Sequence, residues 1–184
     1  MTGRAPDPHA FAIRAAEARD VGDIVRLADG LSALHGDPRG VFDRRAAERD
    51  LFGPRACLGG AVAELQEPGQ EGGAVGARVT GFCLWCAGYE VSYAARGAYL
   101  CSLYVERTAR RRGIGRALIA HAAASVRAEG GVYLWWASAP FNEQGRAFYA
   151  SFGATDETIH AHALTRGAFD ALADAAAHPV AKAR

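Results

Sequence analysis

The segment ARRRGIGRALI, residues 109–119, joins three consecutive arginines to two glycines and then continues into an apolar, alanine-rich stretch. It lies between a stretch of strand character and one of helical character, so its glycines fall where a helix begins. The first amides of a helix have no partner inside it, and the aligned peptide dipoles favour an anion there. Gly113 and Gly115 lack a Cβ, so a phosphate can approach the backbone, and the arginines add forked donors. The segment therefore predicts a site for a ligand with several phosphates, such as a pyrophosphate.

Two common phosphate-binding motifs do not fit this segment. A P-loop requires Lys followed by Ser or Thr after its second glycine, and neither pair follows Gly115. A dinucleotide fold requires a third glycine, where this chain has Leu118. The spacing that does fit is [RQ]-x-x-G-x-[GA].

The whole chain has the composition of one globular domain. It has 184 residues, of which 50% are hydrophobic and 22% charged, with a formal net charge of +1. A net charge this small indicates no general attraction to nucleic acid or membranes. No apolar run approaches the roughly 20 residues of a membrane span, and the N-terminus lacks the apolar core of a signal peptide. We therefore expect a cytoplasmic protein with a disordered tail over 1–10, one domain over 11–177 and a C-terminal tail over 178–184.

The order of expected elements predicts an α/β chain built on a mixed sheet. A strand near 11–14 precedes a helix capped by Asp20, and a long helix over 113–129 has Ile114, Leu118, Ala122 and Val126 on one stripe. Asn142 and Gly153 are expected to bound a short helix. The other expected elements are a helix over 43–52, strands over 57–65, 78–87, 97–106, 131–139 and 154–167, a hairpin loop over 66–77, and a last helix over 168–177.

Two segments together resemble one family. The sequence LYVERTARRRGIGRALI, 103–119, is similar to the coenzyme A loop of the GCN5-related N-acetyltransferase (GNAT) family, and LWWASAPFNEQGRAFYASFGA, 134–154, resembles that family's next strand and helix. The likeness spans roughly residues 11–166 and is closest to the diamine (spermidine/spermine-type) acetyltransferase-like subgroup. It implies a single-domain fold whose mixed central sheet has two splayed parallel strands and flanking helices. It also implies direct acetyl transfer from acetyl-CoA to a primary amine of a small molecule or peptide, by a homodimer.

The resemblance also implies residues for the acetyl-CoA site. A strand edge would pair with the pantetheine arm, the glycine–arginine turn would hold the pyrophosphate, and the short helix would form the far wall. Tyr149 is the expected general acid for the leaving thiolate; Phe148 and Phe152 are expected to share a helical face that excludes it. The expected cofactor-binding residues are Leu103, Tyr104, Val105, Arg110, Arg111, Arg112, Gly113, Ile114, Gly115, Arg116, Asn142, Gly145 and Tyr149.

The acceptor side departs from the subgroup. Cys101 and Ser102 stand where the subgroup has two acids, and His35 occupies another acidic position, which argues against polyamines and favours another primary amine. His35, Cys101, Ser102 and Trp135 are the expected substrate-binding residues, and His35 is also a candidate catalytic base. The base remains open among His35, Glu90, Glu106, Asp156, His160, His162 and a water held by backbone carbonyls.

Several alternatives compete with this interpretation. A sensor that binds acyl-CoA without turnover would also retain the turn, and a nucleic-acid binder would use the arginines. Acetylation of the Cys101 thiol would give a ping-pong enzyme, but its apolar neighbours should raise the thiol pKa. The CLWC motif at 83–86 lies on an expected strand, so its two sulfurs would point to opposite faces. His160 and His162 lack an evident third ligand, and no metal site is expected.

Overall fold

The computed structural model describes residues 10–67 and 76–177. The expected tails therefore lie outside the described residues except for Ala10, as does most of the expected hairpin loop. The chain divides between Ala137 and Ser138 into two compact units.

The first unit is built on a five-stranded mixed sheet in the order β1-β2-β3-β4-β5. Neighbouring strands are antiparallel except β4 and β5, which are parallel. This confirms the expected mixed sheet. The strands are β1 (Phe11–Ala15), β2 (Gly59–Glu67), β3 (Gly76–Glu90), β4 (Ala95–Val105) and β5 (Tyr133–Trp135).

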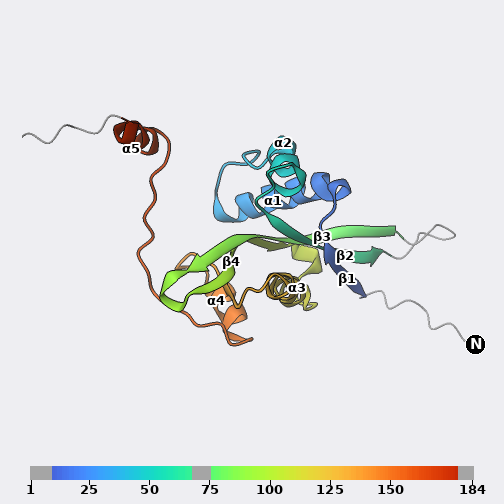
Figure 1. Ribbon diagram of the computed structural model, residues 1–184. Helices are drawn as coiled ribbons and strands as arrows, with labels where there is room; N and C mark the ends of the chain where they lie inside the picture. The colour runs from blue at the N-terminus through green and yellow to red at the C-terminus, as the bar shows by residue number, and fades with distance from the viewer. Residues whose placement is uncertain (1–9, 68–75, 178–184) are drawn as a thin grey trace, which may run out of the picture. The chain divides into compact units, whose positions relative to one another are not determined.

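Helices cover both faces of this sheet. α1 (Val21–His35) and α2 (Arg44–Ala47), which continues into the π-helical η2 (Glu48–Phe52), lie on one face, and α3 (Ile114–Ala128) lies on the other (Figure 1). Three short 3-10 turns complete the unit: η1 (Ala18–Asp20), η3 (Val91–Tyr93) and η4 (Arg107–Ala109).

The apolar stripe predicted for the long helix is the buried face of α3. Ile114, Leu118, Ala122 and Val126 are all buried. On the opposite face of the sheet, residues of α1 such as Ile24 and Leu27 form a core cluster with β2 and β3. Burial of both faces explains why residues of β3 from Val79 to Trp85 are buried in succession, without the polar alternation of a half-exposed strand.

Asp20 does not cap α1 as the sequence suggests. It occupies the N-cap position, but its side chain makes no capping hydrogen bond to α1. Its carboxylate instead accepts two hydrogen bonds from the Arg14 guanidinium, at 2.6 and 2.7 Å, and one from the Glu17 amide. Because Asp20 is only 3% exposed, a tertiary ion pair to β1 outcompetes the local cap.

The second unit contains α4 (Glu143–Ala150) and α5 (Gly167–Ala177). Asn142 caps α4 by accepting a hydrogen bond from the Gly145 amide at 2.9 Å, and Gly153 has a φ of +86°; both features were expected. The strand expected over 154–167 is wrong, because residues 154–166 form no ladder in the described chain. His160 and His162 therefore do not share a strand face.

Candidate active site

The glycine–arginine turn joins the end of β4 to the start of α3 through η4. Two of its residues are left-handed, Arg111 with φ +63° and Gly113 with φ +84°. Gly113 is the N-cap of α3, and no side chain caps the helix there. The first amides of the helix are therefore not used by a capping side chain, as the anion-site prediction requires.

The arginines of the turn have different partners. Arg110 is turned back on β4: its Nε donates to the Val105 carbonyl at 2.9 Å, and its guanidinium carbon lies 5.6 Å from the centroid of the Tyr104 ring. This arginine therefore stabilises the strand–turn junction. No ion pair is formed, within the described chain, by Arg111, Arg112 or Arg116.

β4 and β5 pair over three residues only and then part. Gly97, Ala98 and Tyr99 face Tyr133, Leu134 and Trp135 across the parallel ladder, whereas β4 continues to Val105. A β-bulge lies at this point, because Leu84 pairs with Ser102 and Trp85 with Leu100, which leaves Cys101 as the extra residue. The expected pair of splayed parallel strands is thus confirmed.

At its free edge, β4 directs the backbone groups of every second residue toward the gap between β4 and β5. The Glu106 amide donates to the Thr80 carbonyl of β3, and the backbone groups of successive strand residues point in opposite directions. Leu103 and Val105 therefore direct their backbone groups toward the gap, whereas those of Tyr104 face β3. The Tyr104 side chain lies against Gly30 of α1, so its contribution to a cofactor site would be indirect.

Glu106 is a poor candidate for the base. Its carboxylate pairs with Arg26 and accepts from Arg78 at 2.5 and 3.1 Å. Burial alone would raise the pKa of Glu106, but these hydrogen bonds and charges lower it below its usual value. A carboxylate held in this way is a weak proton acceptor. Sequence spacing carried no signal for this network, because its members lie far apart along the chain.

The remaining base candidates lie in varied surroundings. His35 is the last residue of α1, and its Nδ1 lies 3.8 Å from an Asp37 carboxylate oxygen. Glu90 accepts a hydrogen bond from the Ser92 amide, and Asp156 pairs with Arg146 at 2.8 Å. Within the described chain, none of these residues forms a hydrogen bond, ion pair or ring contact with Cys101, Ser102 or Trp135.

The Cys101 thiol has the high pKa that its apolar neighbours predict. Desolvation, followed by the effect of Cys86, raises the pKa of Cys101 to about 12. Burial likewise raises the pKa of Cys83, whereas Cys86 is half-buried, in keeping with sulfurs on opposite faces of β3. A thiol that remains protonated near neutral pH is a weak nucleophile, which disfavours the ping-pong mechanism.

In the second unit, α4 carries the other expected residues. Gly145 and Tyr149 are four residues apart and share a helical face. A Cβ on Gly145 would lie 2.5 Å from the Asn142 amide nitrogen, so the cap itself requires a glycine there. Phe148 and Phe152, four residues apart, contact each other with ring centroids 5.2 Å apart, as residues on one helical face do. The Tyr149 ring also contacts both, with centroids 5.2 Å from Phe148 and 6.2 Å from Phe152.

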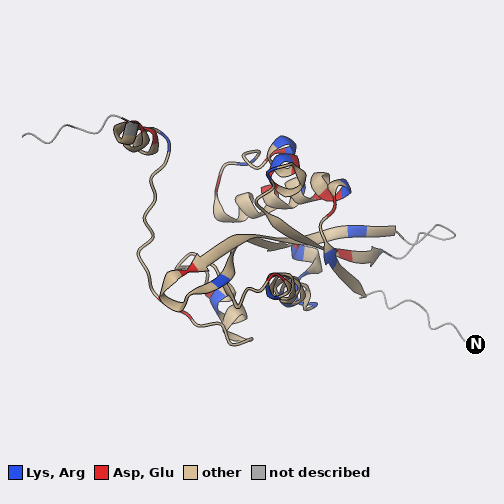
Figure 2. Cartoon of the chain, viewed as in Figure 1, with Lys and Arg blue, Asp and Glu red and all other residues tan. Residues whose placement is uncertain are grey.

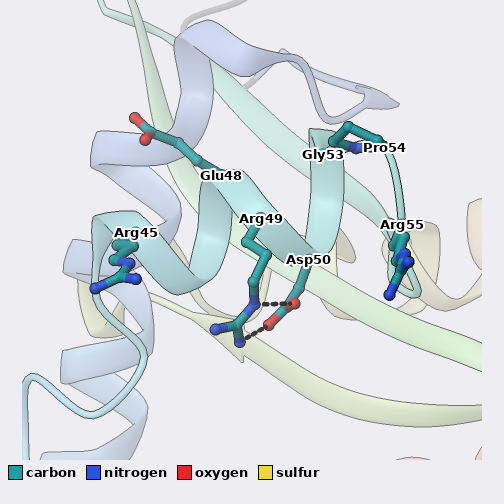
Figure 3. Close-up of a pocket in the computed structure, with 7 residues that line it drawn as sticks. All are labelled: Arg45, Glu48, Arg49, Asp50, Gly53, Pro54 and Arg55. Atoms are coloured by element: carbon teal, nitrogen blue, oxygen red, sulfur yellow. Dashed lines mark hydrogen bonds and ion pairs between the residues drawn. The ribbon is translucent and has the colours of Figure 1, made fainter.

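A basic hollow lies elsewhere, beside α2 and η2 (Figure 3). Arg49 holds Asp50 by two hydrogen bonds of 2.7 Å each, and Arg45 and Arg55 also line the hollow. None of its residues belongs to the sequence-predicted site. Acidic and basic positions are interspersed along the described helices and strands (Figure 2).

Comparison with known families settles the family. The sequence model of the acetyltransferase (GNAT) family matches residues 43–154, more than half of the chain. The protein belongs to the GNAT acetyltransferase family. The matched range contains β4, the glycine–arginine turn and α4, so the expected family and the expectation of an acetyltransferase are confirmed. No curated protein matches the sequence significantly.

Solved structures share the fold of this GNAT protein. An integron cassette protein from the mobile metagenome of V. cholerae is 18% identical, with a TM-score of 0.69 over 89% of this chain and 97% of that chain. A ribosomal-protein-alanine N-acetyltransferase from Brucella melitensis biovar Abortus 2308 is 21% identical, with a TM-score of 0.63 over 86% and 100%. An aminoglycoside acetyltransferase from an uncultured soil metagenomic sample, in complex with sisomicin, is 16% identical, with a TM-score of 0.67 over 85% and 97%. Because these sequence identities are all low, the structural likeness establishes the shared fold alone.

Within residues 10–67 and 76–177, no helix is long and apolar enough to cross a membrane. In the same residues, no group of three or more His, Cys, Asp or Glu side chains has the arrangement of a metal site.

Proposed function

We propose that this GNAT protein transfers an acetyl group from acetyl-CoA directly to a primary amine of a small molecule or peptide. The observation that supports this most strongly is the start of α3 at Gly113, without a capping side chain, beside the gap where β4 leaves β5. A pyrophosphate on the helix amides and an extended arm along β4 would place the thioester in that gap.

Each part of acetyl-CoA has proposed contacts. Leu103 offers its backbone groups and Val105 its amide to the pantetheine arm, since the Val105 carbonyl already accepts from Arg110, and Tyr104 supports them from the α1 face. Arg110 holds the turn in shape, while the other arginines are open to the pyrophosphate. The proposed pyrophosphate contacts are Arg111, Arg112, Gly113, Ile114, Gly115 and Arg116, and by family resemblance Asn142 and Gly145 contribute from α4.

Proton transfer needs an acid and a base. We assign the acid to Tyr149 of α4 by family resemblance, because a positioned hydroxyl can protonate the leaving thiolate. His35 is the proposed base, because a neutral imidazole can accept a proton from an ammonium. Direct attack by the amine is favoured over an acetyl-cysteine, because the Cys101 thiol stays protonated.

Further features of the proposal concern the wider protein. Residues 11–177 act as one catalytic domain, two copies form a homodimer, and the protein works in the cytoplasm without nucleic-acid or membrane partners and without a metal. The diamine acetyltransferase-like subgroup would supply the overall arrangement, but Cys101 and Ser102 in place of its acids argue against polyamine substrates.

The test combines binding and turnover. Calorimetry with acetyl-CoA and with desulfo-CoA should give heat for both, because both carry the pyrophosphate. Release of free thiol from acetyl-CoA should then depend on an added amine, and mass spectrometry should find the acetylated amine. Absence of binding to either compound would refute the acetyltransferase proposal.

An acyl-CoA sensor is the second candidate function. It is favoured by the loss of the acidic pair at Cys101 and Ser102, which removes an evident base. Such a sensor would bind acetyl-CoA in the same experiment but release no thiol with any amine of the panel.

A further inference from the structure

An aromatic pair lies where the two parallel strands part. The rings of Tyr99 and Trp135 have centroids 5.3 Å apart and planes tilted by 35°. These residues face each other in the last paired position between β4 and β5. Tyr99 is 37% exposed and Trp135 48% exposed, so the pair presents a flat apolar surface to solvent. Sequence analysis identified Trp135 but missed Tyr99.

The pair belongs to the α1 face of the sheet. Leu84 packs in the core cluster of α1, and Cys86, two residues farther along β3, must point to the same side. Cys86 is the register partner of Tyr99, which places the aromatic pair on that side as well. The Cys101 bulge follows two residues later on β4, and its thiol approaches the Tyr99 carbonyl at 3.5 Å.

Thiol groups lie beside this aromatic surface. Desolvation is the largest cause of the raised pKa of Tyr99, followed by the effects of Cys101 and Cys86. The pKa of Cys101 is raised by desolvation and by the thiols of Cys86 and Cys57. Within the described residues, no carboxylate forms a hydrogen bond or ion pair with Tyr99, Cys101 or Trp135. A polycationic acceptor would lose hydration here without gaining a counter-charge.

Given the proposed function, we propose that the acceptor is a monoamine with an aromatic body, which stacks on Tyr99 and Trp135 while its amino group reaches the gap at the Cys101 bulge. Offset or edge-to-face contact with two rings gives such a body both area and orientation. Two strand residues span about 7 Å, so an amine two or three carbons from its ring would fit this placement.

A panel of amines tests the substrate class. The panel contains 2-phenylethylamine, 3-phenylpropylamine, n-butylamine, spermidine and an aminoglycoside, each at saturating acetyl-CoA with thiol release as the readout. We expect kcat/KM for the two aromatic amines to exceed that for n-butylamine by about tenfold or more, because ring contacts add to binding. Spermidine and the aminoglycoside should be the poorest substrates.

Variants test the surface itself. Trp135→Leu should raise KM for 2-phenylethylamine about fivefold to tenfold and leave the affinity for acetyl-CoA unchanged, whereas Trp135→Phe should retain most of the preference. Tyr99→Leu should act like Trp135→Leu. The matched control is Tyr93→Leu, which removes an exposed tyrosine that is 82% accessible in η3 and should change neither constant.

The outcomes separate the two proposals. A preference for spermidine or the aminoglycoside, or an unchanged KM for 2-phenylethylamine in both Leu variants, would overturn the aromatic acceptor while leaving the acetyltransferase intact. Acetyl-CoA binding without turnover of any amine would support the acyl-CoA sensor. It would overturn both the proposed acetyl transfer to an amine and the proposed aromatic acceptor. Loss of acetyl-CoA binding in the wild-type protein would refute the proposed function itself.

Discussion

Arg110 Nε donates a hydrogen bond to the Val105 carbonyl at 2.9 Å, so the first of three consecutive arginines is directed back to the strand that precedes it. The same guanidinium lies over the Tyr104 ring. One arginine of the run thus stabilises the junction between strand and turn, whereas Arg111 and Arg112 form no ion pair within the described chain.

Substitution should separate these two roles. Arg110→Met keeps the aliphatic stem but loses the donor, and we expect the free energy of unfolding to fall by about 1–2 kcal/mol. Arg112→Met should leave stability unchanged and weaken acetyl-CoA binding. Urea unfolding and calorimetry measure the two effects, and equal destabilisation by both substitutions would contradict this division.

Gly113 is required by its backbone conformation and not by local packing. Its φ is +84°, and an added Cβ would meet nothing within 4 Å. Gly113→Ala should therefore cost about 1 kcal/mol of stability and, by shifting the helix start, should also weaken acetyl-CoA binding. Gly36→Ala is the matched control, because Gly36 has φ +76° and equally open surroundings at the end of α1. That control should lose similar stability and keep its affinity for acetyl-CoA.

Tyr149→Phe removes the proposed acid while keeping the ring that contacts Phe148 and Phe152. Stability should change little, whereas kcat should fall by about 100-fold, because general acid catalysis contributes on that scale. KM for acetyl-CoA should stay within about threefold of the wild-type value, since the lost effect belongs to the transition state. Steady-state kinetics measures both constants, and an unchanged kcat would remove Tyr149 from the mechanism.

Direct transfer predicts that Cys101 carries no acetyl group. With a pKa raised to about 12, the thiol stays protonated at neutral pH. Intact-mass analysis after incubation with acetyl-CoA, in the absence of an amine, should therefore show unmodified protein. Cys101→Ala should still turn over, with an altered KM for the amine. An acetyl-thioester on Cys101 together with a dead Cys101→Ala variant would establish the ping-pong mechanism instead.

The Arg14–Asp20 pair should control acid stability. Burial is the largest influence on the Asp20 pKa and raises it, but hydrogen bonds from Arg14 and from the Glu17 amide lower it below its usual value overall. Because the folded-state pKa is the lower one, this stabilisation is present above about pH 4 and is lost as the pH falls through the folded-state pKa.

Asp20→Asn should therefore destabilise the protein by about 3 kcal/mol at pH 7, since it leaves Arg14 without its main partner. It should also reduce the loss of stability on acidification. Urea unfolding at pH 7 and at lower pH measures both effects. A variant with the same acid sensitivity as the wild type would show that other carboxylates dominate.

Local interactions explain what the sequence predicted well. The start of α3 at Gly113, the buried stripe from Ile114 to Val126 and the Asn142 cap all depend on residues within a few positions of one another. Helix periodicity and capping act over that range, so they can be recognised in the sequence.

Contacts between residues far apart in the sequence determined the features that the sequence did not predict. Asp20 was predicted as a cap but binds Arg14, and the alternating segment 154–166 forms no strand, because a strand needs a neighbouring ladder as well as propensity. The sequence by itself determined the glycine–arginine turn and the family, since both are properties of contiguous residues. Only the tertiary structure decided that Tyr99 meets Trp135 beside the Cys101 bulge, because strand register brings together residues that lie far apart along the chain.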